Sequence, residues 1–247
     1  MNFRDLVKSK KLYGYWSVIP NVQLHEIFGI AGYDFAIIDM EHGTYSFQEA
    51  LESVIAIKNT GMKCLIRPSS HCEKEILRCL EIGVDGICIP HVRNYQEAKS
   101  VVDACLYPPI GKRGASGFTK ATSYGNEKFS KHIKKSNEDL FISILIESEE
   151  GLNNLSEILQ FDRIDNIYFG TYDIASSMNI KEQDSEQVRR IISKKIDQHS
   201  SVNFGQVSVN KSQFTNLDKR INFVVLGVDC GIILNGAKHN HVVNFSL

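Results

Sequence analysis

The fold of this chain is decided by residues 35–68, FAIIDMEHGTYSFQEALESVIAIKNTGMKCLIRP. The stretch opens with a short, uninterrupted apolar run at 35–39 and closes with another at 63–67, and such runs are typical of buried strands. Residues 46–61 between them have the apolar spacing of an amphipathic helix, and Gly61 stands where a helix end needs a positive φ. The stretch therefore predicts one strand–helix–strand unit.

The same alternation continues along the chain. Amphipathic segments also occupy residues 73–83 and 95–106, with a weaker one at 210–220. We expect eight strands, at residues 14–18, 35–39, 63–67, 86–90, 141–147, 166–170, 203–208 and 222–227. Their apolar runs are uninterrupted, as in parallel strands that are covered on both faces. The pattern predicts an α/β fold, a (β/α)8 TIM barrel, and a doubly wound open sheet is the alternative.

No break in composition marks a domain boundary, so we expect residues 1–247 to form a single (β/α)8 barrel domain. One interval is unusually long. Residues 107–138, between the fourth and fifth strands, include YPPIGKRGASGFTKATSYGN (107–126), which is too rich in Pro, Gly, Ser and Thr to be helical throughout. We expect a loop and helix insertion there, of the kind that serves as a lid or an interface segment.

Composition excludes several classes of function. The net charge of −1 provides no overall basic field for nucleic acid or an anionic membrane. The six cysteines include no C-x-x-C pair and indicate reduced thiols in the cytoplasm. The N-terminal residues lack the apolar core of a signal peptide, and no segment approaches the ~20 apolar residues of a membrane-spanning helix. We expect a cytoplasmic protein that binds neither nucleic acid nor membrane.

Charged side chains follow the predicted strands. The βα loops of a barrel meet at the C-terminal ends of its strands, and active sites form there. The residues at these ends are Asp39, Glu41 and His42 after the second strand, Arg67 after the third, Glu147 after the fifth and Asp173 after the sixth. A structural protein has little reason to gather such side chains on one rim, so the pattern indicates an enzyme.

Glu147 and Asp173 are 26 residues apart, about one βα repeat, so neighbouring strand ends bring both carboxylates to the same place. Two such carboxylates repel each other unless a cation or a shared proton lies between them. Oxygen ligands with room for water suit Mg²⁺ or Mn²⁺. The alternative is that Glu147 caps a helix at 149–160 and Asp173 caps a turn.

The other rim residues also allow two interpretations. His42 lies three residues after Asp39, whose carboxylate would hold one ring nitrogen and leave the other as a base; alternatively, His42 is an ordinary loop histidine. Arg67 would bind a carboxylate or stabilise an enolate oxygen, or would simply neutralise Asp39 or Glu41. Glu81, at the end of a predicted helix, would be either a further partner of the rim or a surface acid. His71 and His91 rank below His42.

With these residues in place, the chain resembles the HpcH/HpaI family of metal-dependent class II pyruvate aldolases over residues 10–235. The matching stretches are AGYDFAIIDMEHG (31–43), LIRPSS (65–70), YPPIGKRG (107–114), IESEEGLNNLSEIL (146–159), FGTYDIASSMN (169–179) and VVLGVDCGIIL (224–234).

The resemblance implies a carbon–carbon lyase, an aldehyde-lyase that cleaves or forms a 2-keto acid through a divalent-metal-bound pyruvate enolate. It implies a homo-oligomer, a trimer or hexamer, that acts on a pyruvate-like 2-keto acid and an aldehyde. It further implies that Glu147 and Asp173 bind Mg²⁺, Mn²⁺ or Co²⁺, with Glu41 in the outer shell of the metal. His42 would transfer protons together with Asp39 and Glu81, and Arg67 would contact the keto or enolate oxygen of the substrate. Substrate binding is implied at Gly170, Thr171 and Tyr172.

Three departures from the family pattern concern the substrate pocket. Leu145 replaces a common Gln, Thr171–Tyr172 replace Pro-[Ser/Ala], and Asn179 replaces a common Gly. Since the metal ligands are kept, we expect a changed substrate preference. The alternatives are a related enolate reaction (oxaloacetate decarboxylation or a citrate-type condensation), a non-catalytic barrel that has lost its pocket, and a barrel for phosphorylated substrates.

Overall fold

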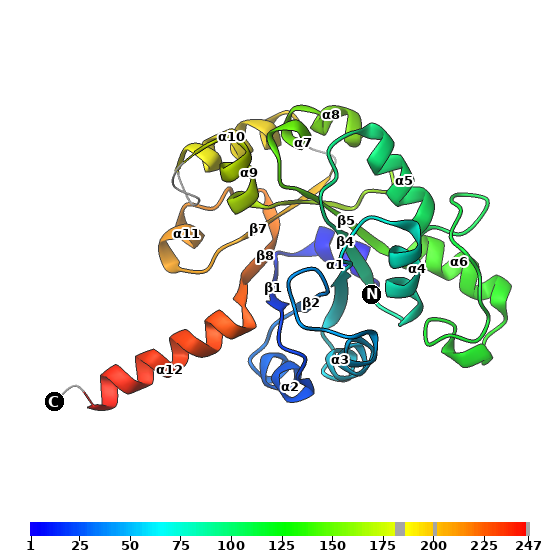
Figure 1. Ribbon diagram of the computed structural model, residues 1–247, viewed down its shortest axis with the longest axis horizontal. Coiled ribbons are helices and arrows are strands. Elements are labelled where there is room, and N and C mark those ends of the chain that lie inside the picture. Colours follow the sequence, from blue (N-terminus) through cyan, green and yellow to red (C-terminus); the bar gives the residue numbers. More distant parts are fainter. Residues whose placement is uncertain (181–185, 200–201, 246–247) are drawn as a thin grey trace.

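The protein is described by a computed structural model, which covers residues 1–180, 186–199 and 202–245. Eight parallel strands pair in chain order and close into a barrel (Figure 1). They are β1 (Leu12–Ser17), β2 (Phe35–Asp39), β3 (Lys63–Arg67), β4 (Gly86–Ile89), β5 (Phe141–Ile146), β6 (Asn166–Phe169), β7 (Asn203–Val207) and β8 (Ile221–Val228). The predicted (β/α)8 barrel is therefore confirmed, and the open sheet is excluded because β8 pairs with β1.

Helices cover the outside of the barrel, and several end as predicted. They are α2 (Val22–Ile30), α3 (Phe47–Asn59), α4 (Glu73–Glu81), α5 (Tyr95–Cys105), α6 (Phe129–Asp139), α7 (Glu149–Asn153), α8 (Leu155–Ile158), α9 (Thr171–Ser177), α10 (Glu186–Asp197) and α11 (Lys211–Thr215). Ser46 and Glu49 form a capping box at the start of α3, which fixes the helix immediately after the rim. Gly61 and Gly83 have φ values of 87° and 80°, as expected of glycines that follow helices.

Both faces of the strands are buried, which explains their uninterrupted apolar sequences. In β2, Phe35 and Ile37 point into the barrel, while Ala36 and Ile38 pack against the surrounding helices. Parallel strands that are covered on both sides carry such continuous apolar runs.

A short helix that the sequence did not predict, α1 (Phe3–Ser9), closes the N-terminal end of the barrel. The Phe3 ring lies 6.0 Å from the ring of Phe35, 4.6 Å from Phe141 and 6.1 Å from Phe223. These three partners stand on β2, β5 and β8, so one side chain fills the bottom of the barrel and leaves the opposite end for the site.

The insertion between β4 and β5 consists of loops, a 3-10 turn (Ser123–Gly125) and α6. Its Ala121 N–H donates to the carbonyl of Glu81, so the insertion packs against the end of α4. Phe118 is 83% exposed and Tyr124 is 63% exposed, so the insertion carries apolar side chains at the surface.

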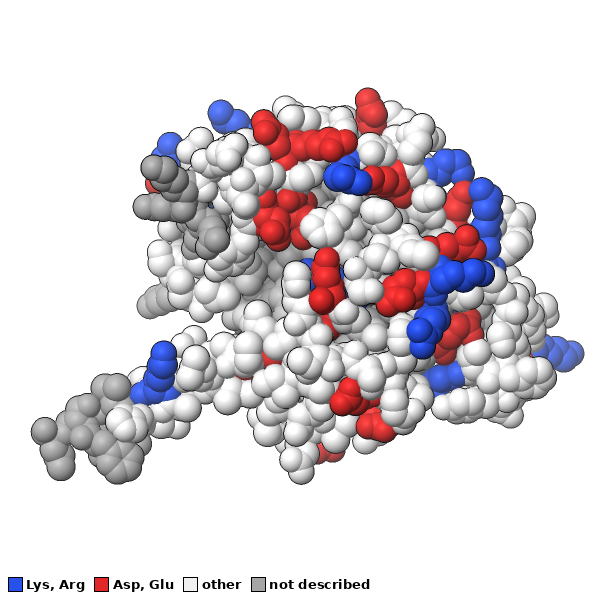
Figure 2. Space-filling view, viewed as in Figure 1, with Lys and Arg blue, Asp and Glu red and all other residues white. Residues whose placement is uncertain are grey.

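The last helix, α12 (Asp229–Phe245), starts against β1 and β8 and then projects away from the barrel (Figure 1; Figure 2). Buried Asp229 anchors its start, because one carboxylate oxygen accepts from the backbone N–H groups of Val18 and Ile19. Ile233 and Leu234 on α12 are exposed. Within the described residues, no helix combines the length and the apolar content needed to cross a membrane.

Candidate active site

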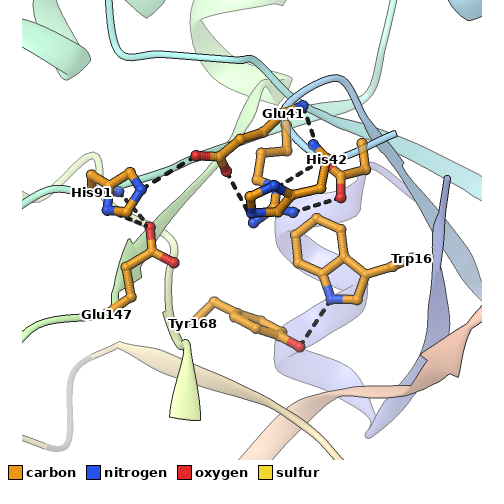
Figure 3. A network of polar contacts seen from close by, with 8 residues as sticks. Trp16, Glu41, His42, His91, Glu147 and Tyr168 are labelled. Atoms are coloured by element: carbon orange, nitrogen blue, oxygen red, sulfur yellow. Dashed lines mark hydrogen bonds and ion pairs between the residues drawn. The ribbon is translucent and has the colours of Figure 1, made fainter. Parts of the chain in front are cut away.

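Asp39 and Arg67 form the buried centre of the rim (Figure 3 shows the surrounding network). They are the last residues of β2 and β3 and lie in direct register. Asp39 Oδ1 accepts from Arg67 Nε at 2.9 Å, and Oδ2 accepts from Nη2 at 2.5 Å. Burial lowers the pKa of Arg67, but the hydrogen bonds and charge of Asp39 more than compensate and raise it. Arg67 is therefore a fixed cation.

The expected contact between Asp39 and the His42 ring is not formed. Asp39 Oδ1 instead accepts from the backbone N–H groups of Glu41, at 3.0 Å, and His42, at 3.1 Å. This turn is typical of aspartate, whose carboxylate binds the backbone two or three residues further on. Asp39 thus fixes the backbone at His42 and leaves the exposed imidazole at the mouth of the site.

His91 joins the two acidic residues of the rim, a role that the sequence did not indicate. Its Nε2 lies 3.3 Å from Glu41 Oε1, and its Nδ1 lies 3.2 Å from Glu147 Oε1. Its backbone N–H also donates to Glu147 Oε1 at 2.7 Å. The backbone of His91 has a φ of 55°, and such strained residues cluster at functional sites.

Glu41 and Glu147 differ in their environment. Glu41 Oε2 lies 3.1 Å from Arg67 Nη1, which places Glu41 between Arg67 and His91. Glu147 is buried, and burial raises its pKa, although His91 and Arg67 partly offset this effect. Glu147 does not cap the following helix, because Ser148 is the N-cap of α7 and accepts from Gly151 N–H. The carboxylate is thus available to a ligand.

Helix α9 begins directly beside Glu147. A Cβ atom on Gly170 would lie 2.7 Å from Glu147 Cβ, so only glycine permits this approach. Asp173 lies in the first turn of α9 and is exposed. Thr171 is buried, whereas Tyr172 is 51% exposed, so the bulky Tyr172 ring faces solvent to a large extent.

A divalent cation is compatible with this donor set. The described residues contain no group of three or more His, Cys, Asp or Glu side chains arranged to hold a metal ion. Glu147 and Asp173 are two hard oxygen donors, and His91 contacts the Glu147 carboxylate at Oε1, through both its backbone N–H and its ring. Two carboxylates suit an ion such as Mg²⁺, which keeps water or substrate oxygens among its ligands.

The floor of the site is aromatic and apolar. The Arg67 guanidinium lies over the Trp16 ring, 4.4 Å from its centroid. Trp16 Nε1 donates to the hydroxyl of Tyr168 at 3.2 Å. Leu145, which stands where the family often has Gln, is the register partner of Tyr168 and packs in the barrel interior. The interior below Arg67 therefore offers an indole, a phenol and an alkyl side chain.

Asn179, which replaces a common Gly, has a φ of 54°, a conformation that Asn tolerates better than most residues.

Glu81 lies at the end of α4, shortly before β4 begins at Gly86, so it is at the N-terminal end of the barrel. There its Oε1 accepts from Arg113 Nη2 at 3.3 Å. The predicted place of Glu81 at the catalytic rim is therefore wrong within one copy of the chain, because helices run back from the rim.

Known proteins share both the sequence pattern and the fold. The HpcH/HpaI aldolase/citrate lyase family pattern matches residues 12–235. Pyruvate aldolase of Rhizobium etli is 32% identical over 174 residues, which cover 70% of this chain and 68% of that protein. The 2-keto-3-deoxy-L-rhamnonate aldolase of Klebsiella pneumoniae is 29% identical over 231 residues, covering 92% and 86%.

Solved structures agree with the fold. The HpcH/HpaI aldolase/citrate lyase family protein of Burkholderia cenocepacia superimposes with a TM-score of 0.88 at 19% identity and covers 96% of both chains. The HpcH/HpaI aldolase of Desulfitobacterium hafniense gives 0.87 at 23% identity, covering 99% of this chain and 97% of that one. As the family pattern spans all eight strands of the barrel, the chain belongs to the HpcH/HpaI aldolase/citrate lyase family and is an aldolase-type carbon–carbon lyase.

Proposed function

We propose that the rim forms or cleaves a pyruvate-like 2-keto acid, with an aldehyde as the second substrate. One observation carries the proposal: Arg67 is held rigidly by Asp39 and Glu41 at the strand ends, next to the buried carboxylate of Glu147. A fixed cation of this kind stabilises negative charge that develops on a keto oxygen as it becomes an enolate.

We further propose that Glu147 and Asp173 hold Mg²⁺, Mn²⁺ or Co²⁺. When bound, such an ion would supply Lewis acidity beside the keto oxygen. The chain's own residues do the remaining work. Arg67 donates hydrogen bonds to the keto oxygen, and the exposed imidazole of His42 accepts and returns the proton of the donor carbon. The backbone amides of Thr171 and Tyr172 at the start of α9 bind the substrate carboxylate.

We also propose a cytoplasmic homo-oligomer, a trimer or hexamer, of single-domain chains. Exposed Ile233 and Leu234 on the projecting helix α12 support association, because a helix that stands away from its own barrel leaves apolar side chains without cover. Light scattering coupled to size-exclusion chromatography measures the mass, and a monomeric wild type together with no effect of Leu234→Asp would contradict this part.

The proposed reaction is tested by the exchange of pyruvate methyl protons in deuterated water, followed by NMR with the metal-free protein and after addition of Mg²⁺, Mn²⁺ or Co²⁺. We expect metal-dependent exchange, a loss of at least 100-fold in His42→Ala, where the base is missing, and a large loss in Asp173→Asn. Asp162→Asn changes an exposed acid outside the rim and serves as the control.

The same assay separates the related reactions. Oxaloacetate as substrate reports decarboxylation, and addition of an aldehyde reports aldol formation. A wild-type protein that exchanges no pyruvate protons with any of the three ions, and binds none of them in calorimetry, would refute the proposal and support a non-catalytic barrel.

A further inference from the structure

Tyr168 lies on β6 with its side chain inside the barrel, below the rim (Figure 3). Its hydroxyl accepts the indole N–H of Trp16, and the two rings meet edge to face at 5.6 Å and 90°. We infer that Tyr168 is a positioning residue for Arg67, acting through Trp16. The inference rests on the proposed function for its kinetic consequence, although the geometry can be tested without turnover.

Neighbouring residues on β5 and β7 confine the Tyr168 ring. Gly205 on β7 is its register partner, and a Cβ there would lie 2.8 Å from Tyr168 Cδ2 and 2.9 Å from Phe223 Cδ1. Leu145 is the register partner on the other side. Tyr168 is 3% exposed, and burial raises the pKa of its hydroxyl, which therefore stays protonated. The phenol cannot turn away from Trp16 without displacing a neighbour.

Trp16 in turn supports the face of Arg67. The guanidinium lies 4.4 Å from the centre of the indole ring, where the negative face of an aromatic ring attracts a cation. Asp39 and Glu41 bind the edge of the same guanidinium. The contacts with Asp39 and Glu41 fix the direction in which the guanidinium points. The indole ring beneath it fixes how far the guanidinium stands above the floor of the site.

The hydroxyl of Tyr168 decides the orientation of that indole. Trp16 is 8% exposed, and a buried indole N–H without an acceptor is unfavourable. Without the Tyr168 hydroxyl, the indole N–H regains a hydrogen bond only if the Trp16 ring turns toward another acceptor or toward water. The aromatic face under Arg67 then changes its orientation. A side chain on β6 thus controls a cation on β3 that it does not hydrogen-bond.

The test is Tyr168→Phe, which removes only the hydroxyl. Tyr15→Phe is a matched control, because Tyr15 adjoins Trp16 on β1 and is also buried, but its hydroxyl bonds His25 on the outer side of the barrel wall. We expect kcat for pyruvate exchange to fall about fivefold in Tyr168→Phe, the effect of one buried hydrogen bond. Tyr15→Phe stays within about twofold of wild type.

A double-mutant cycle shows whether the effect passes through Arg67. If it does, Tyr168→Phe adds less than about twofold in an Arg67→Lys background, because the group that it positions is already lost. An equal, fully additive loss in both backgrounds would mean that Tyr168 acts on the substrate directly, and would overturn the inference. Trp16→Phe, which removes the N–H donor, reproduces the loss if the indole transmits it.

Fluorescence supplies a readout that needs no activity. Trp16 is the only tryptophan of the chain, so intrinsic emission reports this ring alone. We expect a shifted emission maximum in Tyr168→Phe and in Arg67→Lys, and none in Tyr15→Phe. An unshifted spectrum in Tyr168→Phe overturns the inference whatever the kinetics, whereas shifted spectra with an inactive wild type would refute only the proposed reaction.

Discussion

The carboxylate of Asp39 binds the guanidinium of Arg67 through both of its oxygens, across two strands in direct register. The pair is buried at the mouth of a barrel, so neither group is well solvated. Asp39 also fixes the backbone of the His42 turn. One carboxylate thereby sets the place of both groups to which we assign the proton transfer and the oxygen contact.

Asp39→Ala should destabilise the protein by about 3–5 kcal/mol, because it leaves the Arg67 cation buried with only part of its counter-charge. Urea unfolding measures the change. The exposed pair of Glu186 and Arg190 gives the control, since Glu186→Gln should change stability little. A loss below about 1 kcal/mol in Asp39→Ala would show that Arg67 is adequately stabilised by Glu41 alone.

Stability should fall in mild acid because of His25. This histidine is fully buried, and burial lowers its pKa to about 4 from 6.5, although Nδ1 bonds the hydroxyl of Tyr15. A depressed histidine pKa means that the unfolded chain binds the proton more readily, so the stabilisation is complete above pH 6.5 and is lost as the pH falls toward 4.

The measurement is urea unfolding of wild type and His25→Gln between pH 7 and pH 4.5. Glutamine cannot be protonated, so the stability difference should move in favour of the variant on acidification, by on the order of 2 kcal/mol. His239 is exposed, so the stability of His239→Gln should change with pH in the same way as that of the wild type. Parallel curves for His25→Gln would mean that His25 is not a source of the acid sensitivity.

Gly170→Ala should disturb the metal site through a steric effect. The added Cβ would meet Glu147 Cβ at 2.7 Å, so Glu147 or α9 must move, and we expect a destabilisation of about 1–3 kcal/mol. Calorimetric titration with Mn²⁺ should show weaker binding. Gly231→Ala, where a Cβ meets nothing within 4 Å, should bind as wild type does, and equal affinities for both variants would refute the proposed ligand role of Glu147.

Asn179 should tolerate glycine but not alanine. Its φ of 54° is favourable for Gly, is tolerated by Asn and is unfavourable for Ala. We expect Asn179→Ala to lower stability by about 1 kcal/mol and Asn179→Gly to leave it almost unchanged. Thermal unfolding of both variants compares them directly, and a stable Asn179→Ala would show that the side chain, not the backbone, is selected here.

The strands and most of the rim could be predicted from sequence for a physical reason. Two-sided burial demands continuous apolar runs, and parallel topology places the next polar residue at one edge. The partners of those polar residues could not be predicted in the same way. The sequence left open whether Asp39 binds the His42 ring or is neutralised by Arg67, and the second alternative is the one formed, because the register of β2 and β3 places the guanidinium opposite Asp39.

His91 and Glu81 illustrate the same limit. His91 follows β4 like many loop residues, and only its backbone conformation turns its ring between Glu41 and Glu147. Glu81 matches the family by position in sequence, but its helix carries it to the far end of the barrel. Sequence spacing gives the element and its order, whereas the direction of a side chain depends on neighbours from distant segments.

The position of the Phe3 ring at the bottom of the barrel affects the order in which the chain folds. This ring packs near aromatic rings on β2, β5 and β8, so a helix that precedes β1 depends for part of its packing on β8, the last strand of the barrel. Contacts of such long sequence separation form late, because the intervening chain must first be ordered. During synthesis the N-terminal helix must therefore wait, without its final partners, until β8 emerges and the ring of strands closes beneath it.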